Sequence, residues 1–236
     1  MNGQSATFQR IQIRPIEALY AGKDLVSDQY WLFVGITVVG VILGSLVPFG
    51  IIMGALLCGI YMCYFTKMRG EVVSFEMLFK GFDHFVESLI AMLVLVGIML
   101  AVFIPLYVVL IVAMISGFAG NRGGGDATGM MMLLLFGVFY LIVLVVSLLV
   151  FTFTMFAFPL IVDRQLKAIP ALKTSCQATL ANLRTMVPFV LTLGVVSVVA
   201  ALLCYLPALL VMPITFGAIA VVYRQMFPEL PTGTTA

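Results

Sequence analysis

The sequence predicts an all-α integral membrane protein, with six transmembrane helices in three parallel repeats of an amphipathic helix plus a helical hairpin. Three observations predict this class. Of the 236 residues, 63% are hydrophobic and only 9% are charged, whereas a soluble domain carries about 25% charged residues. The apolar residues form runs long enough to cross a bilayer, and the charged residues gather between these runs. Because so few charges cannot cover a water-facing surface, most of the surface is expected to face lipid.

The apolar runs predict the membrane spans. A helix needs about 20 apolar residues to cross a bilayer core of roughly 30 Å. The candidate crossings are 30–47, 49–66, 88–116, 129–161, 186–204 and 207–223. Only "VPFG" separates the first pair and "CYLP" the last, so each pair is expected to form a tight hairpin, broken by Pro48 with Gly50 and by Pro207. The third and fourth runs are longer than a crossing requires, and should tilt, kink at Pro105 or project into water.

The lysines and arginines predict the orientation. Of the twelve, only Arg122 lies on one side of the predicted spans, in the glycine-rich loop "GFAGNRGGGDATG". The remaining eleven (twelve minus one) lie on the other side: Arg10, Arg14, Lys23, Lys67, Arg69, Lys80, Arg164, Lys167, Lys173, Arg184 and Arg224. Positive charge gathers on the cytoplasmic side of membrane proteins. Both termini are therefore predicted to be cytoplasmic.

An amphipathic segment precedes each predicted hairpin, at 15–28, 74–89 and 170–184. The segment 74–89 has the clearest pattern, because its large apolar residues recur at helical spacing while Glu76, Lys80, His84 and Glu87 form the opposite stripe. The segment 170–184 has Pro170 at its start, and one face carries Leu172, Cys176, Leu180 and Leu183. In 15–28, the weakest case, the apolar residues are Ile16, Leu19, Tyr20 and Val26. These helices are expected to lie in the membrane interface, or alternatively to pack on each other or on a partner.

The order of these segments predicts an internal repeat within a single membrane domain over 1–236. The units are about 15–69, 73–163 and 168–227, with flexible tails at 1–14 and 228–236. Short stretches of text agree between units: "PIEALYAGKDL" resembles "AIPALKTSCQATL", Pro48 matches Pro207, and Tyr64 matches Tyr223. Every unit begins on the predicted cytoplasmic side, so the repeats are parallel.

Two stretches carry a family resemblance. "RGEVVSFEMLFKGF" and "FPLIVDRQLKAIPALKTSCQATLANLRTMVPF" resemble uncharacterised bacterial polytopic inner-membrane proteins, within the wider superfamily of the membrane domain found beside glycerophosphodiester phosphodiesterases. The resemblance covers about residues 15–227. It implies an all-helical six-span fold in the bacterial inner membrane and no particular activity.

The sequence offers little for catalysis. The predicted spans contain no charged residue, although buried ionisable groups mark most proton and ion paths through membranes. His84 is the single histidine, and the cysteines lack zinc-ligand spacing. We therefore expect no enzyme activity, catalytic residue, metal or cofactor. "GVILG" at 40–44 and "GIIMG" at 50–54 let helices approach closely; packing inside the protomer is favoured over a dimer face.

A belt of polar and aromatic residues near the span ends is the candidate contact site. Asp163 and Arg164 either anchor the end of the fourth span or bind a head group or partner. The candidate contacts for lipid or a partner are Phe75, Phe79, Phe82, Asp163, Arg164, Lys167, Lys173 and Arg184. The expected partners are membrane lipids and a protein partner or second copy, with no nucleic acid. The favoured function is a non-enzymatic role in membrane or envelope homeostasis. The alternatives are a transporter or channel for a hydrophobic or amphipathic solute, and an accessory membrane subunit of a lipid-metabolic enzyme.

Overall fold

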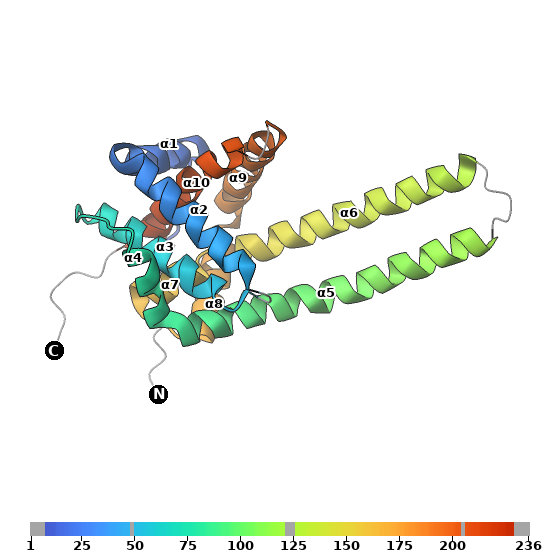
Figure 1. Cartoon of the computed structure of the whole chain (residues 1–236), viewed down its shortest axis with the longest axis horizontal. Coiled ribbons are helices and arrows are strands. Elements are labelled where there is room, and N and C mark those ends of the chain that lie inside the picture. The colour runs from blue at the N-terminus through green and yellow to red at the C-terminus, as the bar shows by residue number, and fades with distance from the viewer. Residues whose placement is uncertain (1–7, 48–49, 121–125, 204–205, 229–236) are drawn as a thin grey trace. The chain divides into compact units, whose positions relative to one another are not determined.

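The computed structural model describes residues 8–47, 50–120, 126–203 and 206–228, and the regular structure in these ranges is helical, without strands (Figure 1). The sequence analysis treated the chain as one domain. The structure divides it into two compact units, one built from Met1–Leu93 and Thr152–Ala236 and the other from Val94–Phe151. Apolar runs reveal which segments avoid water, but they do not reveal which side chains meet each other.

The helices form three successive groups, each a short helix followed by two apolar helices, and the second group ends with the additional α7. The first group is α1 (Pro15–Val26) with the short η1 (Ser27–Gln29), then α2 (Tyr30–Leu46) and α3 (Met53–Met68). The second is α4 (Met77–Lys80) with η3 (Gly81–His84), then α5 (Phe85–Gly120), α6 (Asp126–Thr154) and α7 (Ala157–Arg164). The third is α8 (Ala168–Ala181), α9 (Leu183–Leu202) and α10 (Leu206–Met226). The predicted all-helical class is confirmed in the described residues.

The described part of the chain has five helical stretches long and apolar enough to cross a membrane. They are Pro15–Leu46, Met77–Ser116, Met130–Arg164, Leu183–Leu202 and Pro207–Met226. The protein is therefore a multi-pass helical membrane protein. The predicted span 49–66 is shorter than expected, because Gly50 adopts a positive φ of 65° and α3 begins only at Met53, giving 16 residues.

Helix α3 lies at the centre of the first unit, and most of its residues are buried. Glycines let its neighbours touch its backbone. A Cβ added at Gly59 would lie 1.9 Å from the Leu78 carbonyl oxygen, and one at Gly81 would lie 2.0 Å from the Ala55 carbonyl oxygen. The predicted small-residue motif at 40–44 also packs inside the protomer, since Gly40 faces Ile60. Much of α3 is thus covered by protein.

Helices α1 and α10 form a second close crossing. A Cβ at Gly22 would lie 2.4 Å from the Ala218 nitrogen, and one at Gly217 would lie 2.8 Å from the Gly22 carbonyl oxygen. The buried face of α1 consequently carries Ala18, Gly22 and Val26. The sequence analysis had placed Ile16 and Tyr20 on the apolar face, yet they are 65% and 62% exposed. Close packing selected small residues rather than the largest apolar ones.

The predicted fourth span, 129–161, is interrupted in the structure. Helix α6 ends at Thr154 and α7 begins at Ala157. Pro159 explains the break, because its nitrogen carries no hydrogen to donate to the Met155 carbonyl. Hydroxyls of α8 bond to the end of α6: Ser175 Oγ donates to the Phe153 carbonyl at 2.7 Å. Thr179 Oγ1 donates to the Thr152 carbonyl at 3.2 Å.

This contact also corrects the predicted helix 170–184. Helix α8 runs from Ala168 to Ala181, and its buried face carries Ala171, Ser175, Ala178 and Thr179. Leu180, which was assigned to the apolar face, is 59% exposed. The buried side of α8 is thus the side that bonds α6.

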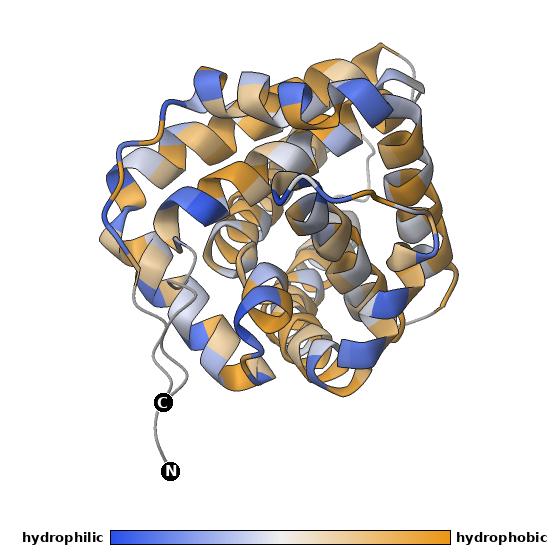
Figure 2. Cartoon of the chain, turned by 90° about the vertical axis from the view of Figure 1, so that its left-hand side faces the viewer, coloured by the Kyte–Doolittle hydropathy of each residue, from blue (hydrophilic) through white to orange (hydrophobic). Residues whose placement is uncertain are grey.

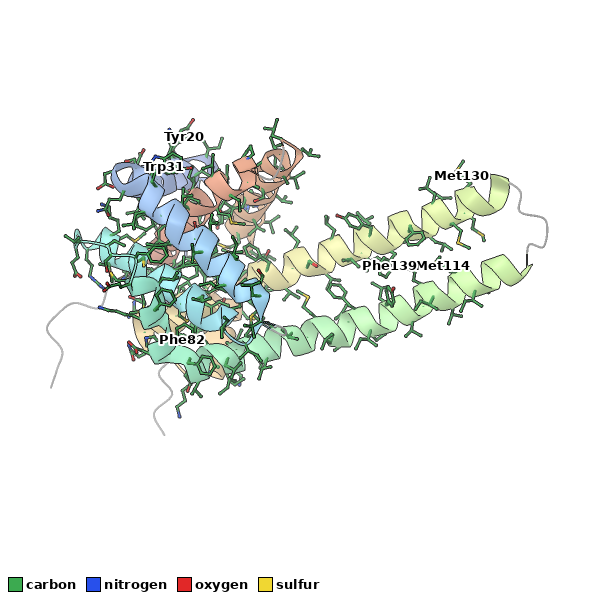
Figure 3. All side chains as sticks on the ribbon, viewed as in Figure 1. Tyr20, Trp31, Phe82, Met114, Met130 and Phe139 are labelled. Atoms are coloured by element: carbon green, nitrogen blue, oxygen red, sulfur yellow. The ribbon has the colours of Figure 1, made fainter. Side chains whose placement is uncertain are left out.

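The second unit contains the middle of α5 and α6, which run antiparallel in Figure 1. Its apolar side chains point outward on most sides, and Figure 3 shows them along both helices. The most apolar window of Met130–Arg164 is 0% buried. One ring contact links the helices, with Tyr107 and Phe139 centroids 6.4 Å apart. A surface this apolar is that of a segment surrounded by lipid.

Residues 8–14 are held against the first unit rather than forming the predicted flexible tail. The Gln9 nitrogen donates to the Met226 carbonyl at 2.9 Å, and the Ile11 nitrogen donates to Asn182 Oδ1 at 2.9 Å. Residues 1–7 and 229–236 of the predicted tails lie outside the described residues. The extended segment 8–14 therefore ties the end of α10 to the α8–α9 junction.

Candidate functional site

The candidate site is an ion cluster between the C-terminal ends of α7 and α10. Asp163 Oδ1 lies 2.8 Å from Arg224 Nη2, and Asp163 Oδ2 lies 3.3 Å from Arg164 Nε. The Tyr223 hydroxyl donates a hydrogen bond to Asp163 Oδ2 at 2.8 Å. We call these four residues the Asp163 cluster. It joins helices that are far apart in the sequence.

The Asp163 cluster is nearly enclosed by the protein. The side chains of Asp163 and Arg164 are each 10% exposed and that of Arg224 is 15% exposed. Aromatic rings form its walls: the Arg224 guanidinium carbon lies 4.6 Å from the centroid of the Phe65 ring. Tyr223 stacks on Phe227 with centroids 5.0 Å apart. A guanidinium over an aromatic face is stabilised by the ring quadrupole, more strongly where water is excluded.

The cluster carries one carboxylate and two guanidinium groups, so its formal charge is positive. Both arginines sit in the last turn of a helix, where the partial negative charge of the helix dipole favours a cation. Arg164 Nη2 also donates to the Pro228 carbonyl. Two arginines held in this way orient their planar donor groups, which suits them to oxyanions.

The sequence prediction found half of this cluster. It named Asp163 and Arg164 as candidate contacts at the end of the fourth span, and the structure places them in contact with each other. It counted Arg224 only as a cytoplasmic charge and noted Tyr223 only as the repeat match of Tyr64. Tyr64 is buried too, and its hydroxyl donates to the Pro213 carbonyl at 2.7 Å. The predicted repeat match between Tyr64 and Tyr223 thus marked two tyrosines whose hydroxyls form hydrogen bonds inside the protein. It did not indicate which groups accept these bonds.

A groove of about 640 Å³ opens beside the cluster in the first unit. It is bordered by α1, the end of α3 and the last turns of α10. Its lining residues are Ala21, Asp24, Leu25, Met68, Val221, Arg224 and Gln225. Arg224 therefore belongs both to the Asp163 cluster and to the wall of an open groove. No residue of α1 was a sequence-predicted site residue, because the α1–α10 crossing is not visible in the sequence.

The predicted basic residues Lys167, Lys173 and Arg184 are exposed and lie outside the Asp163 cluster. Within the described residues, none of them forms an ion pair with the cluster. At the start of α8, next to Lys167, the Ala168 nitrogen donates a hydrogen bond to the Glu87 carboxylate, with Oε2 at 2.8 Å. The predicted polar belt is consequently divided between an enclosed cluster and separate surface charges.

The predicted phenylalanine face lies on the short helices α4 and η3 and the residues before them. Phe75, Phe79 and Phe82 are 37%, 47% and 39% exposed, whereas Leu78 is fully buried. The rings of Phe75 and Phe79 contact each other with centroids 6.3 Å apart, and Phe82 is labelled in Figure 3. The single helix predicted over 74–89 is instead divided into α4, η3 and the start of α5. This division lets Leu78 and Gly81 contact α3.

Hydrophilic residues are sparse in the first unit: Figure 2 shows short blue stretches interrupting largely orange helices. In the described ranges, no group of three or more His, Cys, Asp and Glu side chains could hold a metal ion. Comparison with protein-family models, curated proteins and solved structures found no match for this chain. The resemblance carried by "RGEVVSFEMLFKGF" and the second stretch stays a prediction.

Proposed function

We propose that this protein is a non-enzymatic protein of the bacterial inner membrane that acts through contact with lipid, in membrane or envelope homeostasis. One observation carries the proposal. Phe75, Phe79 and Phe82 are exposed on a segment whose other side is fixed against α3 through Leu78 and Gly81. We call these three residues the phenylalanine face.

The energetics favour lipid as the partner of this face. Burying one large apolar side chain contributes roughly 1.5–3 kcal/mol, so exposing three partly uncovered rings to water is unfavourable. The segment cannot turn the rings inward, because Leu78 already fills the space towards α3. Contact with acyl chains covers them without any change in the fold. The family resemblance, which implies a polytopic membrane protein without a particular activity, is compatible with this role.

Two further aromatic residues fit the same placement. Tyr20 is 62% exposed and Trp31, the only tryptophan, is 75% exposed (both labelled in Figure 3). Tyrosine and tryptophan gather at membrane–water interfaces, where one end of the ring system is apolar and the other is wet. They flank the junction of α1 and α2, at the level where the predicted first span begins. An interfacial position for α1 follows from the same argument.

The proposed topology has six crossings with both termini in the cytoplasm. Helix α3, the second crossing along the chain, would bring the five long stretches to six crossings, although its 16 residues rise only about 24 Å. Since α3 is covered by other helices, it needs no full-length apolar surface of its own. A membrane-impermeant thiol reagent should label Gly124→Cys in intact cells and should not label Lys167→Cys; the reverse pattern would exclude this orientation. Residue 124 lies outside the described residues.

Spin labels test the proposed lipid contact directly. A label at Phe79 should be accessible to oxygen dissolved in the bilayer, whereas a label at Lys80, which is exposed on the adjacent position, should be accessible to a water-soluble nickel complex. Phe79→Asp and Phe82→Asp should make the segment wetter while the protein still inserts. The matched control is Phe79→Leu, which keeps an apolar side chain. Equal water accessibility at both positions would exclude lipid contact here.

The groove favours a second candidate, the passage of an amphipathic solute. Its walls combine Asp24, Arg224 and Gln225 with apolar residues, and it is largely open to the surface. A carrier of such solutes needs an accessible site of mixed polarity. Proteoliposomes containing the protein should then move a fluorescent amphipathic anion faster than empty liposomes. Equal rates would leave lipid contact as the function.

A further inference from the structure

We propose that the groove between α1, α3 and α10 binds the head group of a zwitterionic membrane phospholipid, with the phosphate at Arg224 and the ammonium at Asp24. This inference deepens the proposed lipid contact and rests on it, but it concerns a different surface from the phenylalanine face. It assigns a ligand class to a site with two opposite charges among its lining residues.

The cationic wall of the groove is held in a fixed orientation. Arg224 is anchored by its ion pair with Asp163 at 2.8 Å and by the Phe65 ring beneath its guanidinium. Arg164 adds a second positive charge beside the same carboxylate. A guanidinium already oriented loses less conformational freedom when it binds a phosphate, and its planar donors match phosphate oxygens. The phosphate of the head group therefore belongs at this wall.

The anionic wall is provided by Asp24 in α1. The residue is exposed, and its backbone carbonyl accepts a hydrogen bond from Ser27 Oγ at 2.9 Å. A carboxylate in this wall repels a purely anionic ligand and attracts an ammonium group. An uncharged apolar ligand would make no use of either charge, and a purely anionic ligand would face the Asp24 carboxylate, so a zwitterion matches the charges lining the groove better than either alternative.

The remaining lining selects a lipid over a free zwitterion. Ala21, Leu25, Met68 and Val221 give the groove an apolar surface along which the first part of an acyl chain can lie. Its volume of about 640 Å³ falls within the usual range of small-ligand sites, roughly 300–1,000 Å³. The acyl chain should therefore contribute to binding, and a soluble head group without chains should bind more weakly.

In the proposed topology the groove also lies at the level of the membrane where this ligand is found. It lies at the C-terminal ends of α1, α3 and α10. These ends carry Lys23, Lys67 and Arg69, which belong to the predicted cytoplasmic side. Phospholipid head groups lie at this level, where a spanning helix meets water. A ligand from the inner leaflet can then enter the open side of the groove without leaving the membrane.

The test is native mass spectrometry of the full chain in detergent, with phosphatidylethanolamine, phosphatidylglycerol or diacylglycerol added in equal amounts. Phosphatidylethanolamine should be retained most, and Asp24→Asn should lower its retention about two- to fivefold, the range expected for one exposed charge pair. The same variant should raise retention of phosphatidylglycerol, because it removes a repelling charge. The matched control is Glu17→Gln, which removes a carboxylate of the same helix that pairs with Arg14 outside the groove.

Ala21→Trp adds a second, steric test, because a large ring at this position fills the groove. Its thermal stability is measured first, and retention of phosphatidylethanolamine should fall to the level of diacylglycerol if the protein is folded. An unchanged phosphatidylethanolamine-to-phosphatidylglycerol ratio in Asp24→Asn would overturn the proposal. Equal competition by soluble glycerophosphoethanolamine would also overturn it. The spin-label result at Phe79 does not depend on the groove, so failure here is distinguishable from failure of the proposed function.

Discussion

Asp163 lies between two guanidinium groups, with Arg224 Nη2 at 2.8 Å and Arg164 Nε at 3.3 Å, so α7 and α10 are joined through a single carboxylate. The Tyr223 hydroxyl donates to the same carboxylate. Both arginines therefore lose the same carboxylate if Asp163 is replaced, whereas Asp163 keeps one arginine when the other is lost.

This asymmetry predicts the order of three variants. Asp163→Asn should cost about 3–5 kcal/mol of stability, because it removes the carboxylate that both enclosed guanidinium groups contact. Arg164→Gln should cost less, since Arg224 still pairs with Asp163. In Asp163→Asn with Arg224→Gln, the combined loss should be smaller than the sum of the single losses. Denaturation in mixed detergent micelles measures these three variants and Arg224→Gln alone; strictly additive losses would show that Asp163 and Arg224 do not interact.

The close approach of α3 to α4 predicts a sharp effect of one methyl group. Gly59→Ala would place its Cβ 1.9 Å from the Leu78 carbonyl oxygen, so the two backbones must separate, at a cost of about 2–3 kcal/mol. The matched control is Gly194→Ala, since nothing lies within 4 Å of a Cβ at that position. Melting temperatures in detergent compare the two. Equal melting temperatures would mean that α3 and α4 do not touch in this way.

The hydroxyl contact across the α6–α7 break predicts a role for Ser175. Its Oγ donates to the Phe153 carbonyl at 2.7 Å, and the residue is fully buried. Ser175→Ala should cost about 1–3 kcal/mol, because the partly buried Phe153 carbonyl loses a donor. Ser45→Ala is the control: that residue is exposed and its hydroxyl bonds within its own helix, to Ile42. Hydrogen exchange at residues 152–160 should increase in the first variant only.

The environment of Cys176 predicts a pH dependence for its alkylation. Burial raises the pKa of the Cys176 thiol above its ordinary value of 9.0. Folding therefore favours the neutral thiol, so less thiolate, the reactive form, is present near pH 8 than in the unfolded chain. Alkylation of Cys176 by a small uncharged maleimide, followed by peptide mass spectrometry, should be slower in the folded protein. It should still accelerate above pH 9, and an early plateau would contradict the raised pKa.

Much of the fold could be predicted from the sequence because the solvent of this protein is lipid. Long charge-free runs, such as 88–116, have few alternatives to a helix, since a bilayer offers no hydrogen-bond partners to an exposed backbone. The break before Pro159 could not be placed from hydropathy, because the residues directly on either side of it are apolar. The place of Asp163 and Arg164 at the end of a span was predictable, because these charges directly follow a long apolar run.

The sequence by itself determined that this chain is helical, apolar and built to cross a membrane several times, and it marked Phe75, Phe79 and Phe82 as one face. Tertiary structure alone decided which faces were buried. Gly22 and Ser175, rather than Tyr20 and Leu180, turned inward on their helices because close backbone contact and carbonyl bonding outweighed side-chain size. It alone also brought Arg224 to Asp163 and Asp24 to the groove. Such partners are set by helix crossings, and a crossing depends on residues from two segments that hydropathy reads separately.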